Sequence, residues 1–188
     1  MPDAPGLELI RGEINEAHPD AILETSFDNG GATLVAAPSQ LLEVLSWLRD
    51  TPSQQYRFLS SLHAVDYLPG EPRFGVHYEL LNMPRVERLR VKVLLADPGA
   101  SNGNTGSADA SAEQLPVLDS CVGLFPTAEF HEREVYDFFG IVFRGHPDLR
   151  RILLPEDYVG WPLRRDYPIG GEPVLFTKDE PASPGWYE

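Results

Sequence analysis

The sequence predicts one globular domain that combines helices with strands, and three observations support this. The chain has 188 residues, of which 42% are hydrophobic and 23% are charged, as in a single domain with a core of ordinary size. Segments with apolar residues at helical spacing alternate with segments in which apolar and polar residues alternate singly. No apolar run approaches the roughly 18 to 20 residues that a membrane-spanning helix needs.

The first predicted elements are a helix and a hairpin. Residues 7–17 carry apolar residues at helical spacing, which predicts a short amphipathic helix that Pro19 ends. Residues 21–27 and 32–38 are typical of two strands. Between them lies Asp28-Asn29-Gly30-Gly31, a sequence that readily supplies the positive φ of a tight turn.

A second helix and three further apolar segments follow. Residues 39–50 predict a helix that Ser39 could cap, and its apolar stripe comprises Leu41, Leu42, Leu45 and Leu48. Residues 57–68 are apolar but of uncertain type. Residues 73–83 and 87–97 are better strand candidates, because Leu89, Val91 and Val93 alternate with basic residues as in a half-buried strand.

Residues 98–113 contain no aromatic and no large aliphatic side chain. Such a segment cannot bury enough surface to offset its ordering entropy, which predicts a flexible surface loop. Its glycines do not form a phosphate loop, since no Gly-Lys-Ser or Gly-Lys-Thr ending follows them.

A third helix is predicted from Thr127, a possible cap, to Gly140, its stop, with Phe130, Val135 and Phe138 on or near its buried side. The charged residues Glu132, Arg133, Glu134 and Asp137 are dense for a core face. The plainer hypothesis is a solvated face with intrahelical pairs such as Arg133 with Asp137. A carboxylate cluster with a chemical function is the alternative.

The sequence gives little support for a metal site, a reactive thiol or nucleic-acid binding. His131 and Glu132 begin like a zinc-binding His-Glu-x-x-His helix, but Val135 stands where the second histidine is needed. The histidines at 63, 77 and 146 are scattered singly, so a metal site is not favoured. The one cysteine, Cys121, lies in an apolar run, which favours a buried, inert thiol. The net charge of −14 argues against nucleic acid as a partner.

The C-terminal part, residues 145–188, contains two Arg-Arg pairs, Arg150/Arg151 and Arg164/Arg165, in a Pro-rich stretch. Between residues 129 and 168 there are six arginines and no lysine. Arginine pairs bidentately with carboxylates and is favoured at interfaces, and Tyr158, Trp161 and Tyr167 are aromatic anchors of the kind found there. An arm laid across a partner, or one that folds back on its own domain, would both fit.

Residues 132–168 also carry a long, continuous motif: Glu132-Arg133-Glu134, Tyr136-Asp137, Phe139-Gly140-Ile141, residues 145–153 and residues 162–168. This motif resembles the signature of the 30 kDa (C) subunit of respiratory complex I, the NADH:quinone oxidoreductase. Weaker similarity extends upstream through Val65-Asp66-Tyr67. Departures are modest: Arg165 stands where the family usually has lysine, and Phe130 where tryptophan is common.

The resemblance implies an α+β fold with a mixed sheet, packed helices and a long extended C-terminal arm: a compact domain over residues 1–144 and a partner-binding arm over residues 145–188. It implies a structural subunit without its own cofactor, FMN and iron-sulfur clusters being expected in partner subunits. The chief partner would be the 49 kDa (D) subunit at the quinone site, on the cytoplasmic side of a bacterial cell membrane. Residues expected to contact partners are Glu132, Arg133, Glu134, Asp137, His146, Asp148, Arg150, Arg151, Trp161, Arg164, Arg165, Asp166 and Tyr167.

Two other functions stay open. One is the equivalent subunit of a related membrane-bound hydrogenase, which neighbouring genes for nickel-binding or NADH-binding subunits would distinguish. The other is a freestanding enzyme that uses Glu132, Glu134 and Asp137 as a carboxylate cluster. Such an enzyme would turn over a substrate when purified alone, whereas a complex I subunit would not.

Overall fold

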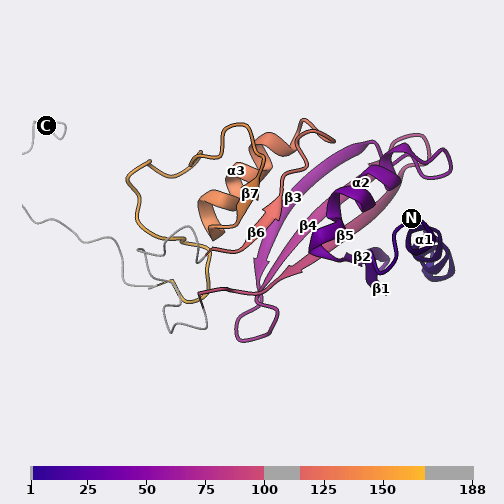
Figure 1. The fold of residues 1–188 in the computed structure, drawn as a ribbon, viewed down its shortest axis with the longest axis horizontal. Helices are drawn as coiled ribbons and strands as arrows, with labels where there is room; N and C mark the ends of the chain where they lie inside the picture. Colours follow the sequence, from indigo (N-terminus) through magenta and orange to yellow (C-terminus); the bar gives the residue numbers. More distant parts are fainter. Residues whose placement is uncertain (1, 100–114, 168–188) are drawn as a thin grey trace, which may run out of the picture.

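The fold is a five-stranded mixed sheet with a layer of helices, seen in a computed structural model that describes residues 2–99 and 115–167 (Figure 1). Its three α-helices in these ranges are α1 (Ala4–Ala17), α2 (Leu41–Asp50) and α3 (Ala128–Phe139), and a 3-10 turn, η1 (Pro38–Gln40), precedes α2. The strands are β1 (Ile22–Asp28), β2 (Gly31–Ala36), β3 (Phe58–Asp66), β4 (Phe74–Asn82), β5 (Glu87–Leu95), β6 (Val117–Asp119) and β7 (Val142–Arg144).

The large sheet has the order β1-β2-β5-β4-β3. Its neighbours are antiparallel except for β2 and β5, which run parallel with Leu34 opposite Val91. The short strands β6 and β7 form a separate parallel pair. The predicted α+β class with a mixed sheet is therefore confirmed.

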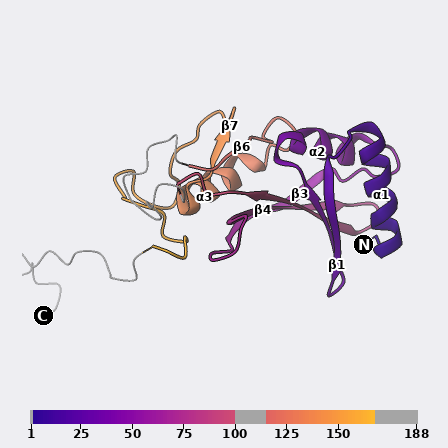
Figure 2. The same cartoon turned by 60° about the horizontal axis from the view of Figure 1, so that its bottom comes forward.

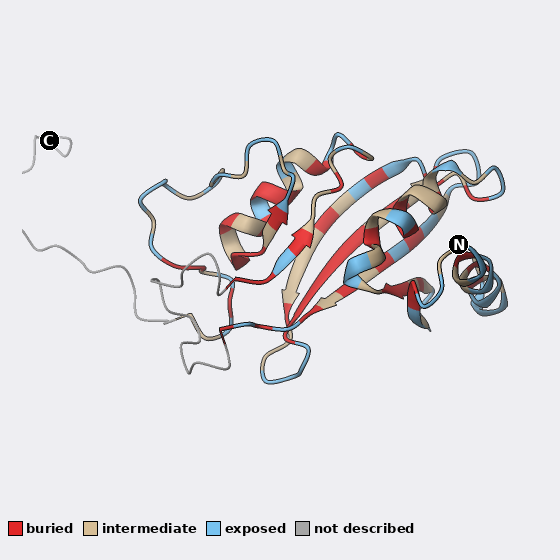
Figure 3. Ribbon diagram, viewed as in Figure 1, coloured by how far each residue is buried: buried red, intermediate tan, exposed pale blue. Residues whose placement is uncertain are grey.

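Within the described part of the chain, helices cover one face of the large sheet. Figure 2 shows α2 above the strands, and α1, α2 and α3 all contribute apolar residues to one core with the sheet. On the opposite face, Tyr67 packs against His77. The buried stripes in Figure 3 follow from strand alternation, since Leu89, Val91 and Val93 are fully buried while the residues between them face the opposite side. The core lies between this face and the apolar stripes of the helices.

The N-terminal elements form as their patterns predict. Helix α1 buries Leu7, Ile10 and Ile14 against the sheet, and the Asp3 side chain caps it by accepting the Gly6 amide at 2.8 Å. Strands β1 and β2 form the predicted hairpin. Its turn places Asn29 and Gly30 at positive φ, 51° and 77°.

Residues 57–68, of uncertain type from sequence, contain strand β3, and the two better strand candidates are β4 and β5. Pairing with β4 on one side makes β3 an edge strand. This position explains its ambiguous pattern, because Phe58 stays exposed at one end while Leu59 and Leu62 enter the core.

Two local predictions, for Ser39 and Phe130, are wrong, and that for Thr127 is right in position only. Ser39 lies inside the 3-10 turn, and α2 begins after Gln40 without a side-chain cap. Thr127 does precede α3, but it makes no capping bond, since its hydroxyl lies 3.3 Å from the Leu59 carbonyl. Phe130 is 57% exposed, because α3 turns its polar face inward.

Residues 145–167 contain no helix or strand, as the prolines predict, and they lie beside α3 in Figure 1. Most of the predicted loop, residues 100–113, and the end of the arm, residues 168–188, lie outside the described residues. The boundary between domain and arm at residue 144 therefore stays a prediction. Within residues 2–99 and 115–167 no helix is long and apolar enough to cross a membrane.

Candidate partner-docking site

Helix α3 carries most of its charged side chains toward the protein interior. It ends at Gly140, as predicted, with a φ of 69° that glycine adopts without strain. Glu132 and Asp137 are fully buried and Arg133 is 9% exposed, whereas Glu134 faces solvent. The hypothesis of a solvated charged face is therefore wrong, because the neighbouring segments supply hydrogen-bond partners for the buried groups.

Asp137 is the main anchor for the arm. Its Oδ2 atom accepts the backbone amides of Ile152, Leu153 and Leu154 at 3.1, 2.8 and 2.9 Å. Its Oδ1 atom accepts Arg151 Nη1 at 2.8 Å. Burial alone would raise the pKa of Asp137, but these donors hold that pKa below its usual range. The carboxylate stays ionised and fixes residues 151–154 against α3.

Arg133 and Arg151 hold the same segment from two sides. Arg133 donates from Nε and Nη2 to the carbonyls of Arg150 and Arg151, both at 3.2 Å. Arg151 donates from Nη2 to the Gly160 carbonyl at 2.9 Å. The predicted intrahelical pair of Arg133 with Asp137 is absent among the described contacts, because each of the two side chains binds the arm instead.

Glu132 binds the connection between β6 and α3. Its Oε2 accepts the Ser120 hydroxyl at 2.7 Å and its Oε1 accepts the Cys121 amide at 2.8 Å. Burial raises the pKa of Glu132, and the two donors offset this only in part. Burial also raises the pKa of the Cys121 thiol, with Glu132 adding to the effect. Cys121 is fully buried, as predicted.

Arg73, just before β4, is a second anchor and is only 1% exposed. Its guanidinium binds Asp66 through Nε at 3.1 Å and Nη2 at 2.8 Å, Asp97 through Nη1 at 2.7 Å, and Asp166 through Nη2 at 2.6 Å. The pKa of Asp66 would rise on burial, but Arg73 and two backbone amides lower it. Arg73 was not among the predicted site residues, since its three carboxylates are separated from it along the chain.

The two residues of the second arginine pair, Arg164 and Arg165, differ in burial. Arg164 is buried, donates from Nε to the Phe139 carbonyl at 2.7 Å, and lies over the Phe74 ring at 5.0 Å. Burial lowers its pKa. Arg165 is exposed, and its Nη1 donates to the Leu68 carbonyl at 2.6 Å while its amide binds Asp66 at 2.9 Å.

Aromatic rings pack the arm against the end of α3. Trp161 meets Tyr136 edge-on at 5.4 Å between ring centroids, and Arg151 lies 4.6 Å above the indole. A Cβ atom at Gly140 would lie 2.6 Å from the same indole, so this close packing requires glycine. The Tyr158 and Tyr167 hydroxyls are 2.9 Å apart.

His146 shapes the start of the arm. Its Nε2 lies 2.9 Å from the Glu129 carbonyl, and its Nδ1 accepts the Asp148 amide at 3.0 Å, which matches a neutral ring protonated on Nε2. Asp148 binds Arg150 at 2.9 Å on the surface. Of the first arginine pair, Arg150 is thus exposed and Arg151 is largely buried.

Two histidines that are scattered in the sequence are neighbours in the fold. His63 and His77 face each other across β3 and β4 with parallel rings, 5.1 Å between centroids. Tyr67 binds His77 Nε2 at 3.0 Å. Burial lowers the pKa of His77 to about 3, with His63 contributing. Strand register, which a single sequence does not reveal, brings them together.

The structure therefore gathers most of the predicted partner residues into one unit, but through contacts within the chain. Two buried clusters, around Asp137 and around Arg73, pin residues 145–167 to the domain. The exposed predicted residues are Glu134, Asp148, Arg150 and Arg165. Which of these residues contact a partner stays a prediction.

Comparison with known proteins identifies the family. The family described as "Respiratory-chain NADH dehydrogenase, 30 Kd subunit" matches residues 34–173. The chain belongs to this family. A curated member, the C subunit of NADH-quinone oxidoreductase from Roseiflexus castenholzii, is 42% identical over 168 residues, which cover 89% of this chain and 87% of the relative. The equivalent protein of Herpetosiphon aurantiacus, with the same name, is 40% identical over 153 residues, 81% of this chain and 80% of that one.

Two solved structures share the fold of this chain. The trypsin-resistant fragment of Nqo5 is 29% identical, with a TM-score of 0.57 over 76% of this chain and 98% of the fragment. A chain of the archaeal membrane-bound sulfane sulfur reductase has a TM-score of 0.64 over 86% of this chain and 85% of that one. At 20% identity, the latter shows a shared fold alone.

Proposed function

We propose that this 30 kDa family member is a structural subunit in the peripheral arm of proton-translocating NADH:quinone oxidoreductase, where it docks the 49 kDa subunit of the quinone site. The curated relatives are named as the C subunit of NADH-quinone oxidoreductase, which supports the assignment to this complex. The chain contributes to electron transfer by holding its partners in place and performs no chemistry itself.

The pinned arm is the observation that carries the proposal. Exposed apolar side chains recur along it: Leu153 is 61%, Val159 is 59% and Leu163 is 53% exposed. Their backbone is held by the Asp137 and Arg73 clusters, so little entropy is lost when a partner covers them. A preorganised surface with apolar side chains is what a stable contact between subunits requires.

The redox cofactors belong to other subunits in this proposal. An iron-sulfur cluster is usually held by several cysteine thiolates, and the sequence contains only Cys121, which is buried. FMN and the clusters would lie in partner chains. The subunit itself would lie on the cytoplasmic side of the bacterial membrane, attached through its partners.

The test is to replace Leu153 and Leu163 by aspartate in the full chain and to purify the membrane complex through another subunit. The matched control is Leu9→Asp, because Leu9 on α1 is 70% exposed but lies outside the arm. We expect the arm variants to lower the amount of this chain and of the 49 kDa subunit in the complex. NADH:quinone activity should fall only in proportion to the assembled complex.

Two outcomes would contradict the proposal. Normal assembly of both arm variants would show that the exposed leucines face solvent in the complex. A fully assembled complex with activity lowered about a hundredfold would show that the chain takes part in the chemistry.

A further inference from the structure

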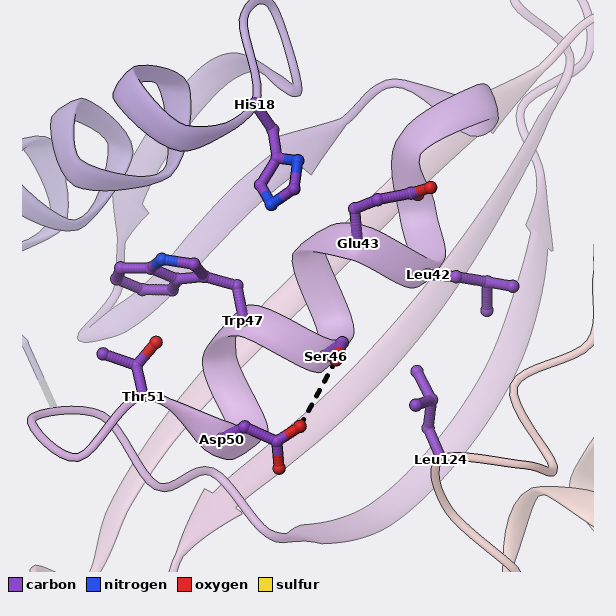
Figure 4. A pocket seen from close by; sticks show the side chains of 8 residues that line it. All are labelled: His18, Leu42, Glu43, Ser46, Trp47, Asp50, Thr51 and Leu124. Atoms are coloured by element: carbon purple, nitrogen blue, oxygen red, sulfur yellow. Dashed lines mark hydrogen bonds between the residues drawn. The ribbon is translucent and has the colours of Figure 1, made fainter.

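A groove of about 640 Å³ lies on the outer face of α2, away from the sheet, and none of its lining residues belongs to the arm (Figure 4). We call it the α2 groove. It is lined by His18, Leu42, Glu43, Ser46, Trp47, Asp50, Thr51 and Leu124. Figure 4 shows the Trp47 and His18 rings on one side of it and Leu42 with Leu124 on the other.

The groove is apolar where a solvated helix face would be polar. Leu42, Trp47 and Leu124 are all half-buried, although none lies in the fully buried core. Tryptophan is enriched at the centres of protein interfaces and is a common anchor there. A space of this size accommodates several side chains of a docked segment rather than a single one.

A hydrogen bond between α2 and the loop after β6 holds one wall of the groove. Arg49 Nη1 donates to the Leu124 carbonyl at 3.1 Å, which ties the loop after β6 to α2 and fixes one wall. The same Arg49 binds the Asp50 carboxylate through Nε and Nη2 at 2.8 and 2.7 Å. A preformed wall lowers the entropy lost on binding.

The charge of the groove selects a basic ligand. Asp50 is already neutralised by Arg49, but Glu43 is exposed and has no ion-pair or hydrogen-bond partner among residues 2–99 and 115–167. An unpaired carboxylate beside an apolar groove fits a lysine or arginine next to apolar side chains. Because the chain has a net charge of −14, its overall field adds to this preference.

The same charge disfavours the occupants that this chain could supply. A second copy would bring another net charge of −14 to the groove. Residues 100–114 contain two acidic and no basic residues, and residues 168–188 contain four acidic residues and one lysine. The remaining source of a basic segment is another protein.

We propose that the α2 groove docks an amphipathic segment of another subunit of the complex, with apolar side chains against Trp47 and a lysine or arginine facing Glu43. This inference rests on the proposed function. It adds a second contact, outside the arm, and specifies the chemistry of the segment that occupies it.

Photo-crosslinking in the assembled complex tests it. The photoreactive amino acid p-benzoylphenylalanine replaces Ser46, which lines the groove, and in a control it replaces Glu13, an exposed residue of α1 outside the groove. We expect position 46 to cross-link to one segment of another subunit that carries large apolar residues and a lysine or arginine. Position 13 should not reach that segment.

A charge exchange then examines the role of Glu43. Glu43→Lys should lower the cross-link yield about tenfold or more, because like charges placed together cost more than a single unpaired charge. Replacing the basic residue of the segment by glutamate should restore the yield in the Glu43→Lys background. An unchanged yield in Glu43→Lys would overturn the assigned role of Glu43.

The remaining outcomes separate this inference from the proposed function. A chain that enters the complex but gives no cross-link at position 46 would overturn the groove assignment and leave the proposed function standing. A cross-link to a second copy, to the chain itself or to a segment without a basic residue would also overturn it. A chain absent from the complex would overturn both.

Discussion

The Nη2 atom of Arg73 lies 2.6 Å from the Oδ1 atom of Asp166, although the two residues are 93 positions apart in the sequence. The same guanidinium binds Asp66 at the end of β3 and Asp97 after β5. One buried cation therefore fixes three chain segments: the end of β3, the exit from β5 and the arm. The path of the arm depends on a residue that lies outside it.

Arg73→Lys should destabilise the chain strongly, even though it keeps the charge. An ammonium group cannot span three carboxylates as a guanidinium does, and breaking a buried pair costs about 3–5 kcal/mol. Arg88→Lys is the matched control, because Arg88 on β5 is exposed, and it should change the free energy of unfolding by less than about 0.5 kcal/mol. Urea unfolding of the isolated chain measures both. Equal stabilities would show that the cluster contributes nothing specific.

Asp137→Asn should lower stability at neutral pH by about 3–5 kcal/mol, because Arg151 loses its counter-charge in a buried site. Folding lowers the pKa of Asp137, so the stability that the carboxylate provides is full above its unfolded pKa of about 4 and is lost as the pH falls through its folded pKa. The difference between parent and variant should thus shrink toward about pH 3. A difference that stays constant between about pH 7 and pH 3 would contradict this assignment.

Charge reversal should have different effects at Arg164, which is buried, and at Arg150, which is exposed. Arg164→Glu places a carboxylate beside the Arg73 cluster, near Asp97 and Asp166, and should prevent normal folding of the arm. Arg150→Glu affects an exposed side chain and should leave the isolated chain folded, with a loss of about 1 kcal/mol or less. Near-UV circular dichroism, which reports on the packing of Trp161, distinguishes them. Identical spectra for the two variants would refute the distinction.

Gly140→Ala should cost about 1–3 kcal/mol, because alanine is strained at a positive φ and its Cβ would meet Trp161. Gly12→Ala provides a matched control within α1, where a Cβ has open space. That change should stabilise the chain by about 0.5–1 kcal/mol, since alanine favours the helix. In thermal unfolding, Gly140→Ala should therefore lower the melting temperature and Gly12→Ala should raise it. A gain in stability for Gly140→Ala would contradict the close packing against Trp161.

Much of the fold follows from local pattern. Helix α1 and strand β5 were predictable because each buries one face, so apolar spacing alone identifies them. The hairpin was predictable from its turn, in which Asn29 and Gly30 adopt positive φ. The helix caps were less predictable, since Thr127 occupies the N-cap position of α3 but its hydroxyl donates to Leu59 on β3. Competing long-range contacts decide such details.

The contacts that hold the arm to the domain could not be predicted from the sequence, and which of the predicted residues contact a partner stays a prediction. The density of charge on α3 and the arginine pairs marked the region. That Asp137 and Arg133 turn inward could not be known, because their partners come from residues 150–154 through tertiary packing. Arg73 gave no local signal at all: a single arginine after a proline looks like any surface turn until Asp66, Asp97 and Asp166 are brought around it.

The parallel pairing of β2 with β5 has a consequence for synthesis on the ribosome. The β1–β2 hairpin emerges from the ribosome early, but the strand that completes its inner edge is made only after β3 and β4. Until β5 is made, the edge of β2 that pairs with it has unpaired backbone N–H and C=O groups. Such an edge can pair with a wrong strand and lead to misassembly. Helices α1 and α2 flank the hairpin in the sequence and are available at once to cover its apolar face. Because α1 and α2 are made on either side of the hairpin, they can cover its apolar face until β5 has been synthesised.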